Sequence, residues 1–405
     1  MTTENKVEVL VVGAGPVGLF AALWLSERGV QARIIDNYQR ASLHSYALAL
    51  HPATLRMLDE LGIAEKLIER GQRLGHVVVH RLGNEPNEID FAAVGDPFPF
   101  ALVVPQTLLE GVLESRLADN GVNVDWRHQL MSFRESDGTV ISRVGRVTEN
   151  GDDMQLERVA SSFLIAADGY NSFTRRALEI NLTPVGPPLN FGLLETRCAL
   201  ETRDRVHLVF GARTTDVYWP VPPDRGRWSV QYERGEDTSA DSLRSRIHER
   251  APWYPKEREP LEWTTTVSFQ RRLAERFGHD RIWLAGDSAR FGSPIGVQPM
   301  NVGLREARDL ARRMADILRE GGSDNLLHVY NTERRREWNT LLGIKDRLER
   351  GNSSSWSHAQ VARLVPSLPA SGRDLNRLLE QVGFRLRWKR TMAKLDPALL
   401  RDLEP

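Results

Sequence analysis

The pattern of hydrophobic and polar positions at the start of the chain predicts a complete β-α-β unit. An unbroken apolar run over residues 9–12 is typical of a buried parallel strand. Residues 19–28 are rich in alanine and leucine, and this pattern predicts a helix that ends at Gly29. The apolar positions 30–35 predict a second strand, closed by Asp36.

Three glycines separate the first strand from the helix in the spacing G-x-G-x-x-G. Gly13 permits a tight turn, Gly15 lets a pyrophosphate approach the backbone, and Gly18 lets the helix pack near the strand. The helix N-terminus then offers free N–H groups and a positive dipole end to an anion. Asp36 lies where a carboxylate accepts from a ribose hydroxyl. We therefore predict a dinucleotide site, which this stretch alone does not assign to NAD or FAD, and its loop contributes Gly13, Gly15, Pro16, Val17 and Gly18.

The next hundred residues continue the alternation of strands and helices. Leucines spaced along one face predict a helix over 52–61, and a shorter one follows over 64–70. Residues 103–120 begin as an extended segment and become an amphipathic helix that Gln106 opens. Residues 131–159 predict an antiparallel meander, with hairpin turns at 137–138 and 150–153.

A second candidate ligand position follows a buried strand near residue 165. Asp168-Gly169 ends this strand, and Ser172 begins a helix with two arginines. An aspartate at the carboxyl end of a parallel strand lies where doubly wound sheets bind ligands. Asp-Gly is equally favoured in an ordinary strand-to-helix turn, so both interpretations stay open.

The pattern of hydrophobic and polar residues changes between residues 191 and 270. Short alternating segments and turn residues predict a mostly antiparallel sheet, rich in tryptophan and tyrosine. A short apolar strand at 281–284 and a long helix at 301–319 then return to the strand–helix pattern of the first part of the chain. Charged helices follow from residue 330.

These patterns predict an α/β fold in which a Rossmann-type domain is interrupted by a mostly antiparallel sheet. We expect a discontinuous nucleotide-binding domain, an inserted substrate-binding sheet domain and a C-terminal helical segment. Their expected ranges are 1–75, 103–185 and 276–340 for the first, 76–102 and 186–275 for the second, and 341–405 for the third.

Composition and charge narrow the function. The 405 residues include 54 Lys plus Arg and 54 Asp plus Glu, so no net field attracts nucleic acid or an anionic membrane. The single cysteine, Cys198, excludes an intrachain disulfide and fits a reducing cytoplasm. We see no signal peptide, no stable membrane insertion and no metal-ligand spacing, and we expect a cytoplasmic monomer or homodimer.

Taken together, three motifs resemble the flavoprotein aromatic hydroxylases, the single-component FAD monooxygenases of the para-hydroxybenzoate hydroxylase type. They are G-A-G-P-V-G at 13–18 with Asp36, A-D-G-Y-N-S-F-T-R at 167–175, and G-D-S-A-R-F-G-S-P-I-G-V-Q-P-M-N at 286–301. The resemblance spans about residues 7 to 340, and it implies FAD as the cofactor.

The resemblance also implies roles for individual residues. The region of Asp168 serves flavin and nicotinamide binding in the family, and Asp287, after Gly286, matches an aspartate at the ribityl–pyrophosphate region. Pro294 matches a proline beside the isoalloxazine, which makes it a candidate catalytic residue. Further cofactor contacts implied by the resemblance are Gln106, Gly296, Met300 and Asn301.

The sequence departs from the family pattern at several places near the flavin. Tyr46 replaces a usual arginine, and Val297 and Pro299 replace usual glycines. Arg290 stands where G-D-A-A-H has its histidine, and Glu306 replaces a usual aspartate. Val297 and Pro299 predict either a less usual position of the flavin or a reshaped pocket at its reactive face, whereas Tyr46 bears on one pyrophosphate contact and Glu306 is a mild change.

The family's mechanism implies the chemistry. NADPH or NADH reduces the flavin, O₂ forms the flavin C(4a)-hydroperoxide, and this species oxygenates an electron-rich substrate. We expect an aromatic, bulky, natural-product-like substrate bound over the inserted sheet. Arg227 is the candidate catalytic residue there, and the candidate substrate contacts are His207, Tyr218, Trp219 and Tyr232. For these four, packing within the sheet is the alternative interpretation.

Other functions remain open at this point. A flavin-dependent reductase or dehydrogenase of the same fold would work without oxygen, and a non-catalytic binding protein would keep the scaffold without the flavin. A flavin-dependent halogenase would need a W-x-W-x-I-P motif, and Y-W-P-V-P at 218–222 does not match it.

Overall fold

The structure is a computed structural model of the chain. It describes residues 4–39, 47–81, 86–94, 96–147, 154–185, 188–197, 203–211, 214–221, 224–255, 261–291 and 298–341. Several sequence expectations fall outside these ranges, namely those on Tyr46, the turn at 150–153, Cys198, Pro294, Gly296, Val297 and nearly all of the segment 341–405.

The β-α-β unit forms as the sequence predicts, at the centre of an eight-stranded sheet. Strands β1 (Glu4–Val12) and β2 (Ala32–Asp36) pair in parallel, and β1 also pairs in parallel with β11 (Met154–Ala166). The sheet has the order β19-β20-β11-β1-β2-β8. Its other members on this path are β8 (Val124–Trp126), β19 (Gly278–His279) and β20 (Ile282–Leu284).

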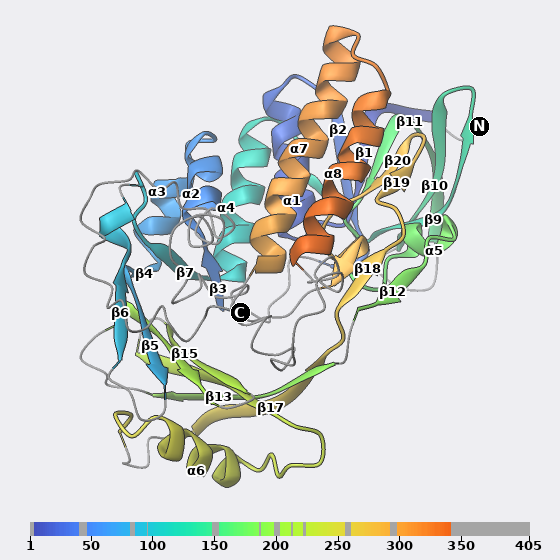
Figure 1. Ribbon diagram of the computed structural model, residues 1–405. Coiled ribbons are helices and arrows are strands. Elements are labelled where there is room, and N and C mark those ends of the chain that lie inside the picture. Colours follow the sequence, from blue (N-terminus) through green and yellow to red (C-terminus); the bar gives the residue numbers. More distant parts are fainter. Residues whose placement is uncertain are drawn as a thin grey trace.

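Helix α1 (Pro16–Glu27) lies in the middle of the helical layer. Proline at its first position supplies a preset φ, and Gly29 with φ of 69° ends the helix in the left-handed conformation. Every residue from Gly18 to Leu25 is buried, as expected for a helix with neighbours on both sides. Figure 1 shows α4 (Gln106–Asp119), α1, α7 (Gln298–Glu320) and α8 (Asn325–Leu341) side by side.

An antiparallel extension continues the eight-stranded sheet beyond β11. Strands β9 (His128–Ser136) and β10 (Thr139–Val147) form a hairpin that pairs through β10 with β11. Asp137 and Gly138 both have positive φ values, of 51° and 71°. These values suit a two-residue hairpin turn, so the turn predicted at this dipeptide is confirmed.

A seven-stranded sheet stands opposite the helical layer, with the order β17-β13-β16-β15-β14-β5-β6. Only the β14–β5 pair is parallel, so the mostly antiparallel prediction is confirmed. Its strands are β5 (His76–Arg81), β6 (Asn87–Asp90), β13 (Leu189–Arg197), β14 (Arg205–Phe210), β15 (Thr215–Val221), β16 (Arg225–Tyr232) and β17 (Leu261–Phe269).

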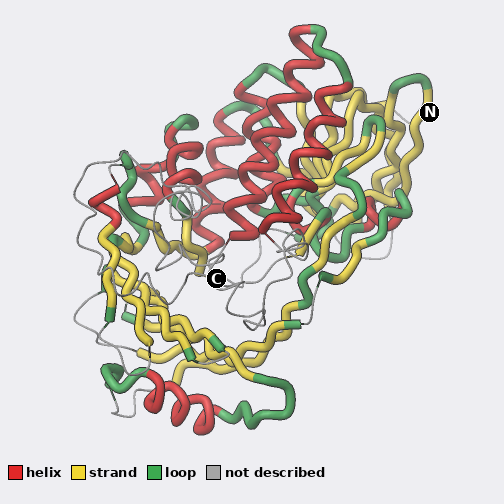
Figure 2. The backbone as a smooth tube through the Cα atoms, viewed as in Figure 1, coloured by secondary structure: helices red, strands yellow, loops and turns green. Residues whose placement is uncertain are grey.

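Helix α6 (Ala240–Arg250) covers the outer face of this sheet, which the sequence analysis did not anticipate. Leu243 and Ile247 of the helix pack against Trp228 and Tyr218, and Figure 2 shows the helix beyond the sheet, away from the helical layer. The remaining residues of α6 are mostly polar, so its apolar signal is confined to a narrow face.

Two small sheets and short helices complete the described structure. One sheet has the order β3-β7-β4 and the other β12-β18-β21. Their strands are β3 (Ala47–Leu50), β4 (Gln72–Leu74), β7 (Ala101–Pro105), β12 (Leu182–Pro184), β18 (Arg272–Ala274) and β21 (Arg290–Phe291). The short helices are α2 (Pro52–Asp59), α3 (Ala64–Ile68), α5 (Phe173–Ala177) and the 3₁₀ turns η1 (Phe91–Val94) and η2 (Gly286–Ser288).

The predicted fold class is confirmed: an α/β nucleotide-binding unit carries an inserted, mostly antiparallel sheet. The domain boundaries proposed from the sequence stay a prediction. Among the helices of the described residues, none combines the length and the apolar character needed to cross a membrane.

Two histidines pack against each other on the outer face of the seven-stranded sheet. His80 Nε2 lies 3.0 Å from His207 Nδ1, and the ring of Trp253 stacks on both. Desolvation by burial lowers the pKa of His80 from 6.5 to about 4. Desolvation, together with the charges of His80 and Arg205, lowers the pKa of His207 to about 3. The folded protein therefore holds both rings neutral at neutral pH.

The histidine pair makes stability depend on pH. Below pH 6.5 the two histidines become protonated in the unfolded chain, whereas in the folded chain they stay neutral down to about pH 4. The free energy of unfolding therefore falls as the pH falls through this window. We expect wild-type protein to lose about 2 kcal/mol more than His207→Phe between pH 7 and pH 5. Urea denaturation at the two pH values measures this, and equal losses would contradict the prediction.

Candidate active site

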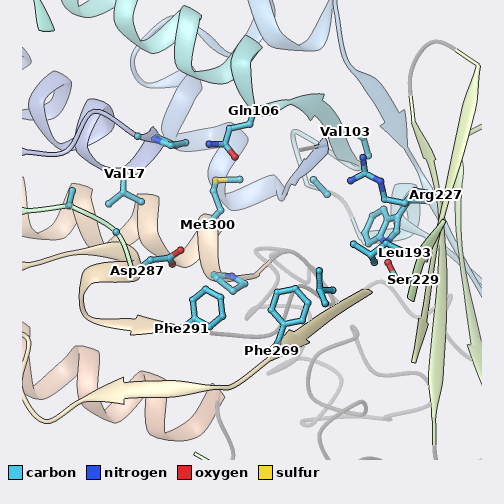
Figure 3. Close-up of a pocket in the computed structure, with 18 of the residues that line it drawn as sticks. Val17, Val103, Gln106, Leu193, Arg227, Ser229, Phe269, Asp287, Phe291 and Met300 are labelled. Atoms are coloured by element: carbon cyan, nitrogen blue, oxygen red, sulfur yellow. The ribbon is translucent and has the colours of Figure 1, made fainter. Parts of the chain in front are cut away.

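One cavity joins the glycine-rich loop to the inner face of the seven-stranded sheet. Its volume is about 650 Å³. Figure 3 shows Asp287, Met300 and Gln106 on one side of it, with Arg227 and Ser229 on the sheet side. The residues that line it are Gly15, Pro16, Val17, Ala49, Val103, Gln106, Ala167, Gly169, Leu193, Trp219, Val221, Arg227, Ser229, Val267, Phe269, Ala285, Asp287, Phe291, Pro299 and Met300.

The three glycines of the loop have different surroundings. A Cβ on Gly13 would lie 2.3 Å from the carbonyl oxygen of Ala167, and one on Gly18 would lie 1.8 Å from that of Gly13. Both therefore serve close packing. A Cβ on Gly15 would meet nothing within 4 Å, because this residue faces the cavity. The loop thus leaves open backbone beside the N-terminus of α1, where an anion binds favourably.

Asp36 and Asp168 support the loops at the carboxyl ends of two parallel strands. The carboxylate of Asp36 accepts from the N–H of Ala14 at 2.7 Å. One oxygen of Asp168 accepts from both the N–H and the hydroxyl of Thr174 at 3.0 Å. The other oxygen, Asp168 Oδ1, is buried and has no hydrogen-bond partner among the described residues. Asp168 therefore shapes the start of α5 and keeps one acceptor oxygen available.

Gln106 reaches the cavity from the first turn of α4. Its Nε2 donates to Glu110 Oε1 at 2.7 Å, and Glu110 is only 3% exposed. Desolvation raises the pKa of the Glu110 carboxyl, while the bond from Gln106 opposes this rise. Within the described structure, Glu110 Oε2 is buried without a hydrogen-bond partner. This pair orients the amide of Gln106 toward the cavity.

Asp287 presents its carboxylate to the cavity from the same side as Gln106 and Met300. It lies on the 3₁₀ turn η2, whose first residue is Gly286. Gly286 has φ of 68°, and a Cβ on this residue would lie 3.1 Å from the side chain of Val17. Desolvation and the nearby Glu306 raise the pKa of Asp287, and the guanidinium of Arg290, 2.7 Å away, opposes them. The side chain remains 46% exposed, toward the cavity.

The sheet side of the cavity is apolar apart from Arg227 and Ser229. Arg227 donates from Nε and from a terminal nitrogen to Glu195 Oε2, at 3.0 and 2.6 Å, and Arg225 donates to Glu195 Oε1 at 2.7 Å. Glu195 is 2% exposed. Two arginines on one carboxylate leave an excess positive charge beside the cavity.

The chain matches a known protein family. The family described as "FAD binding domain" matches residues 6–342. The chain is 30% identical over 334 residues to 6-methylpretetramide 4-monooxygenase of Streptomyces rimosus. This match covers 81% of the chain and 59% of the relative, so the chain spans about three fifths of that relative's length.

Two solved structures share the fold. The p-nitrophenol 4-monooxygenase of Pseudomonas putida DLL-E4 matches with a TM-score of 0.74 at 20% identity, covering 95% of this chain and 100% of that one. Aklavinone-11 hydroxylase, solved with FAD and aklavinone, matches with a TM-score of 0.66 at 23% identity, covering 81% of this chain and 65% of that one.

The chain belongs to this FAD-binding family. The resemblance to the single-component flavoprotein aromatic hydroxylases is thereby confirmed. The site also fits FAD on its own evidence. Gly15 leaves space for a pyrophosphate, and Glu110 and Asp168 each hold a buried oxygen that lacks a donor within the described residues.

Many of the residues predicted from the sequence meet at the cavity. Those that line it are Gly15, Pro16, Val17, Gln106, Asp287, Met300, Trp219 and Arg227. Gly13, Gly18, Asp36, Asp168 and Gly286 lie behind it as supports of its loops. Pro294 and Gly296 lie outside the described residues.

Asn301 lies next to the cavity-lining residue Met300 and has its side-chain amide engaged within the protein. It is 6% exposed and does not line the cavity. Its Nδ2 donates to the carbonyl of Ala49, and its Oδ1 accepts from the N–H of His51 and the hydroxyl of Thr54. The Asn301 amide therefore ties the start of α7 to β3 and α2, and a direct contact of this residue with the cofactor stays a prediction.

The structure does not bring the other substrate candidates to the cavity. His207 and Tyr218 belong to the aromatic cluster under α6, because alternate residues of a strand face opposite sides of a sheet. Tyr232 shares the face of Trp228 and Val230 by the same alternation. Trp219 and Arg227 occupy the opposite positions and face inward.

Several cavity residues were missed by the sequence reasoning. Val267 and Phe269 of β17 and Phe291 of β21 line the wall, and the rings of Phe269 and Phe291 stack with centroids 6.1 Å apart. The alternation of Leu261, Trp263, Val267 and Phe269 with polar residues in β17 was a usable signal. The pairing with Phe291 was not visible, because it depends on a contact between separate sheets.

Potential metal ligands do not gather at this site. Within the described ranges, one group brings three such ligand atoms together, Glu135, His279 and Asp280. All three are exposed and none lines the cavity.

Proposed function

We propose that the protein is an FAD-dependent monooxygenase that uses NADPH or NADH and O₂ to oxygenate an aromatic, bulky small molecule. The observation that carries this proposal is the single cavity running from the dinucleotide loop to an apolar sheet wall with one arginine. The three relatives described above are monooxygenases or hydroxylases whose names give 6-methylpretetramide, p-nitrophenol and aklavinone as substrates.

Each end of the cavity has its own task in this proposal. The backbone at Gly15 and the N-terminus of α1 hold the pyrophosphate, and Asp36 and Glu110 accept from ribose hydroxyls at the adenosine end. Asp287 and the first turn of α7, with Pro299 and Met300, hold the ribityl and ring end. Bound FAD supplies hydride acceptance and oxygen activation, which no side chain can perform.

The sheet wall binds and orients the substrate. Leu193, Trp219 and Phe269 give it an apolar, partly aromatic surface suited to flat rings. Arg227 is fixed by Glu195, so its charge is placed before the substrate arrives and favours an acidic phenol oxygen. The same wall excludes water from the ring end of the cofactor.

The spectrum of the purified protein tests this function. We expect flavin absorption bands that NADPH or NADH bleaches and that air restores, since the cavity binds FAD and O₂ reoxidises it. A polycyclic phenol such as alizarin should accelerate NADPH oxidation more than 4-hydroxybenzoate does, and its product should gain one oxygen atom by mass spectrometry.

Anaerobic turnover separates the competing functions. A monooxygenase stops after one reduction of the flavin when O₂ is absent, whereas a reductase or dehydrogenase continues. Colourless protein that does not take up FAD would contradict every enzymatic proposal, and equal stimulation by 4-hydroxybenzoate and alizarin would contradict the bulky substrate.

A further inference from the structure

Arg290 is a buried cation next to the cavity with several partners. Its side chain has no exposed surface. It donates to Asp287 Oδ1 at 2.7 Å, to the carbonyl of Pro299 at 2.6 Å and to Glu306 Oε2 at 3.1 Å. Its guanidinium carbon lies 4.5 Å from the ring centroid of Trp338. The side chain of Arg290, which belongs to β21, therefore contacts three other elements. These are the turn η2, helix α7 at its start and further along, and helix α8.

Two of these four contacts are with residues that line the cavity. Asp287 lies on the wall at η2, and Pro299 lies on the wall at the start of α7. Arg290 is thus a direct bridge between two separate segments that face the ring end of the cofactor site. Since a guanidinium is planar and its N–H directions are fixed, it sets the distance between its acceptors.

The surroundings of Arg290 are built to hold it. Glu306 has no exposed surface and also accepts from the N–H of Gly286 at 3.1 Å and from Trp338 Nε1. Gly303 on α7 leaves the necessary room, because a Cβ there would lie 2.7 Å from a terminal nitrogen of Arg290. Arginine at 290 and glutamate at 306, two departures from the family pattern, are therefore direct partners.

We propose that Arg290 is a positioning residue for FAD, which locks the carboxylate of Asp287 and the carbonyl of Pro299 into one arrangement at the ring end of the cavity. The inference rests on FAD binding, which follows from family membership, and it does not depend on the proposed monooxygenase activity.

A pair of variants separates positioning from charge balance. Arg290→Met leaves the buried carboxylate of Glu306 and the partly exposed carboxylate of Asp287 without the guanidinium that pairs with both, and Arg290→Met with Glu306→Gln removes one of these charges. We expect both variants to weaken FAD binding by at least about tenfold, since each loses the charge-assisted bonds to Asp287 and Pro299. The double variant should recover the melting temperature of the apoprotein but not the affinity.

Arg313→Met is the matched control. Like Arg290, Arg313 is a buried arginine, but it lies on α7 and donates to Asp309, Glu333 and the carbonyl of Leu326 without touching the cavity. We expect this variant to lower the melting temperature while its dissociation constant for FAD stays within about threefold of wild type. Titration of apoprotein with FAD, followed by flavin fluorescence, measures the constants.

A milder variant covers the case in which Arg290→Met does not fold. Arg290→Lys keeps the charge and loses the planar fork, so it should fold and still bind FAD about tenfold more weakly, with a shifted visible flavin spectrum. Wild-type affinity and spectrum in Arg290→Lys would overturn the proposal. Recovery of FAD affinity in the double variant would also overturn it, because charge balance alone would then explain the network.

Discussion

Gly15→Val abolishes FAD binding at micromolar FAD and leaves the apoprotein folded. Gly15 has φ of −72° and ψ of 179°, an extended conformation that valine adopts readily. A Cβ there meets no protein atom within 4 Å, so we expect the melting temperature of the apoprotein to change by less than about 2 °C. The added methyl groups instead fill the space beside the N-terminus of α1, where we propose that the pyrophosphate binds.

The size of the effect follows from what the backbone does at this position. The pyrophosphate must approach the open N–H groups closely, and displacement from them removes several charge-assisted hydrogen bonds, so the dissociation constant should rise by at least about 100-fold. Isothermal titration of apoprotein with FAD measures it. A constant within about threefold of wild type would show that FAD binds elsewhere.

Two other glycines serve as controls for this experiment. Gly111 is exposed on α4 with open space around it, and Gly111→Ala should leave FAD affinity unchanged. Gly13→Ala should instead destabilise the apoprotein, because its Cβ would lie 2.3 Å from the carbonyl of Ala167 at a φ of 103°. We therefore expect Gly15 to matter for ligand binding, and Gly13 and Gly18 to matter for the packing of the loop.

Arg227→Met destabilises the protein by about 2 kcal/mol, because it leaves the buried carboxylate of Glu195 with Arg225 as its remaining arginine partner. Urea denaturation measures this loss. Arg197→Met is the control, since Arg197 and its partner Glu262 form an exposed pair on the same sheet, and its loss should cost less than about 0.5 kcal/mol. Equal losses in the two variants would show that burial of Glu195 does not strengthen its pairing.

The same substitution has a second expected effect, which depends on the proposed function. Methionine keeps the apolar bulk of the wall and removes the charge that faces the substrate. The stimulation of NADPH oxidation by alizarin should fall at least about tenfold, while FAD affinity stays within about threefold. Unchanged stimulation would exclude Arg227 from substrate binding and leave it as a structural partner of Glu195.

The expectations for the substrate side show where sequence reasoning fails. Tyr218 and Trp219 are adjacent in the chain and looked equivalent, yet Trp219 lines the cavity and Tyr218 packs under α6 with Trp228 and Tyr254. The two faces of β15 are both largely buried, so neither hydrophobicity nor residue type told them apart. Only the presence of α6 on one face and the cavity on the other decides between them.

Asn301 and Arg290 show a related limit. The motif around Asn301 indicated a position near the flavin but not the partners of its amide, which are Ala49, His51 and Thr54, about 250 residues earlier in the chain. Arg290 and Glu306 looked like separate departures from a family pattern. Their pairing appears only when η2 and α7 are brought together.

The sequence by itself determined the elements whose causes are local. Apolar runs, the G-x-G-x-x-G spacing and Asp137-Gly138 act over a few residues, and so β1, α1, β2 and the β9–β10 hairpin form as predicted. The tertiary structure alone decided which face of each sheet strand meets the cavity, and which charges meet Arg290 and Glu195. These depend on contacts between segments far apart in the chain, whose energies no local pattern encodes.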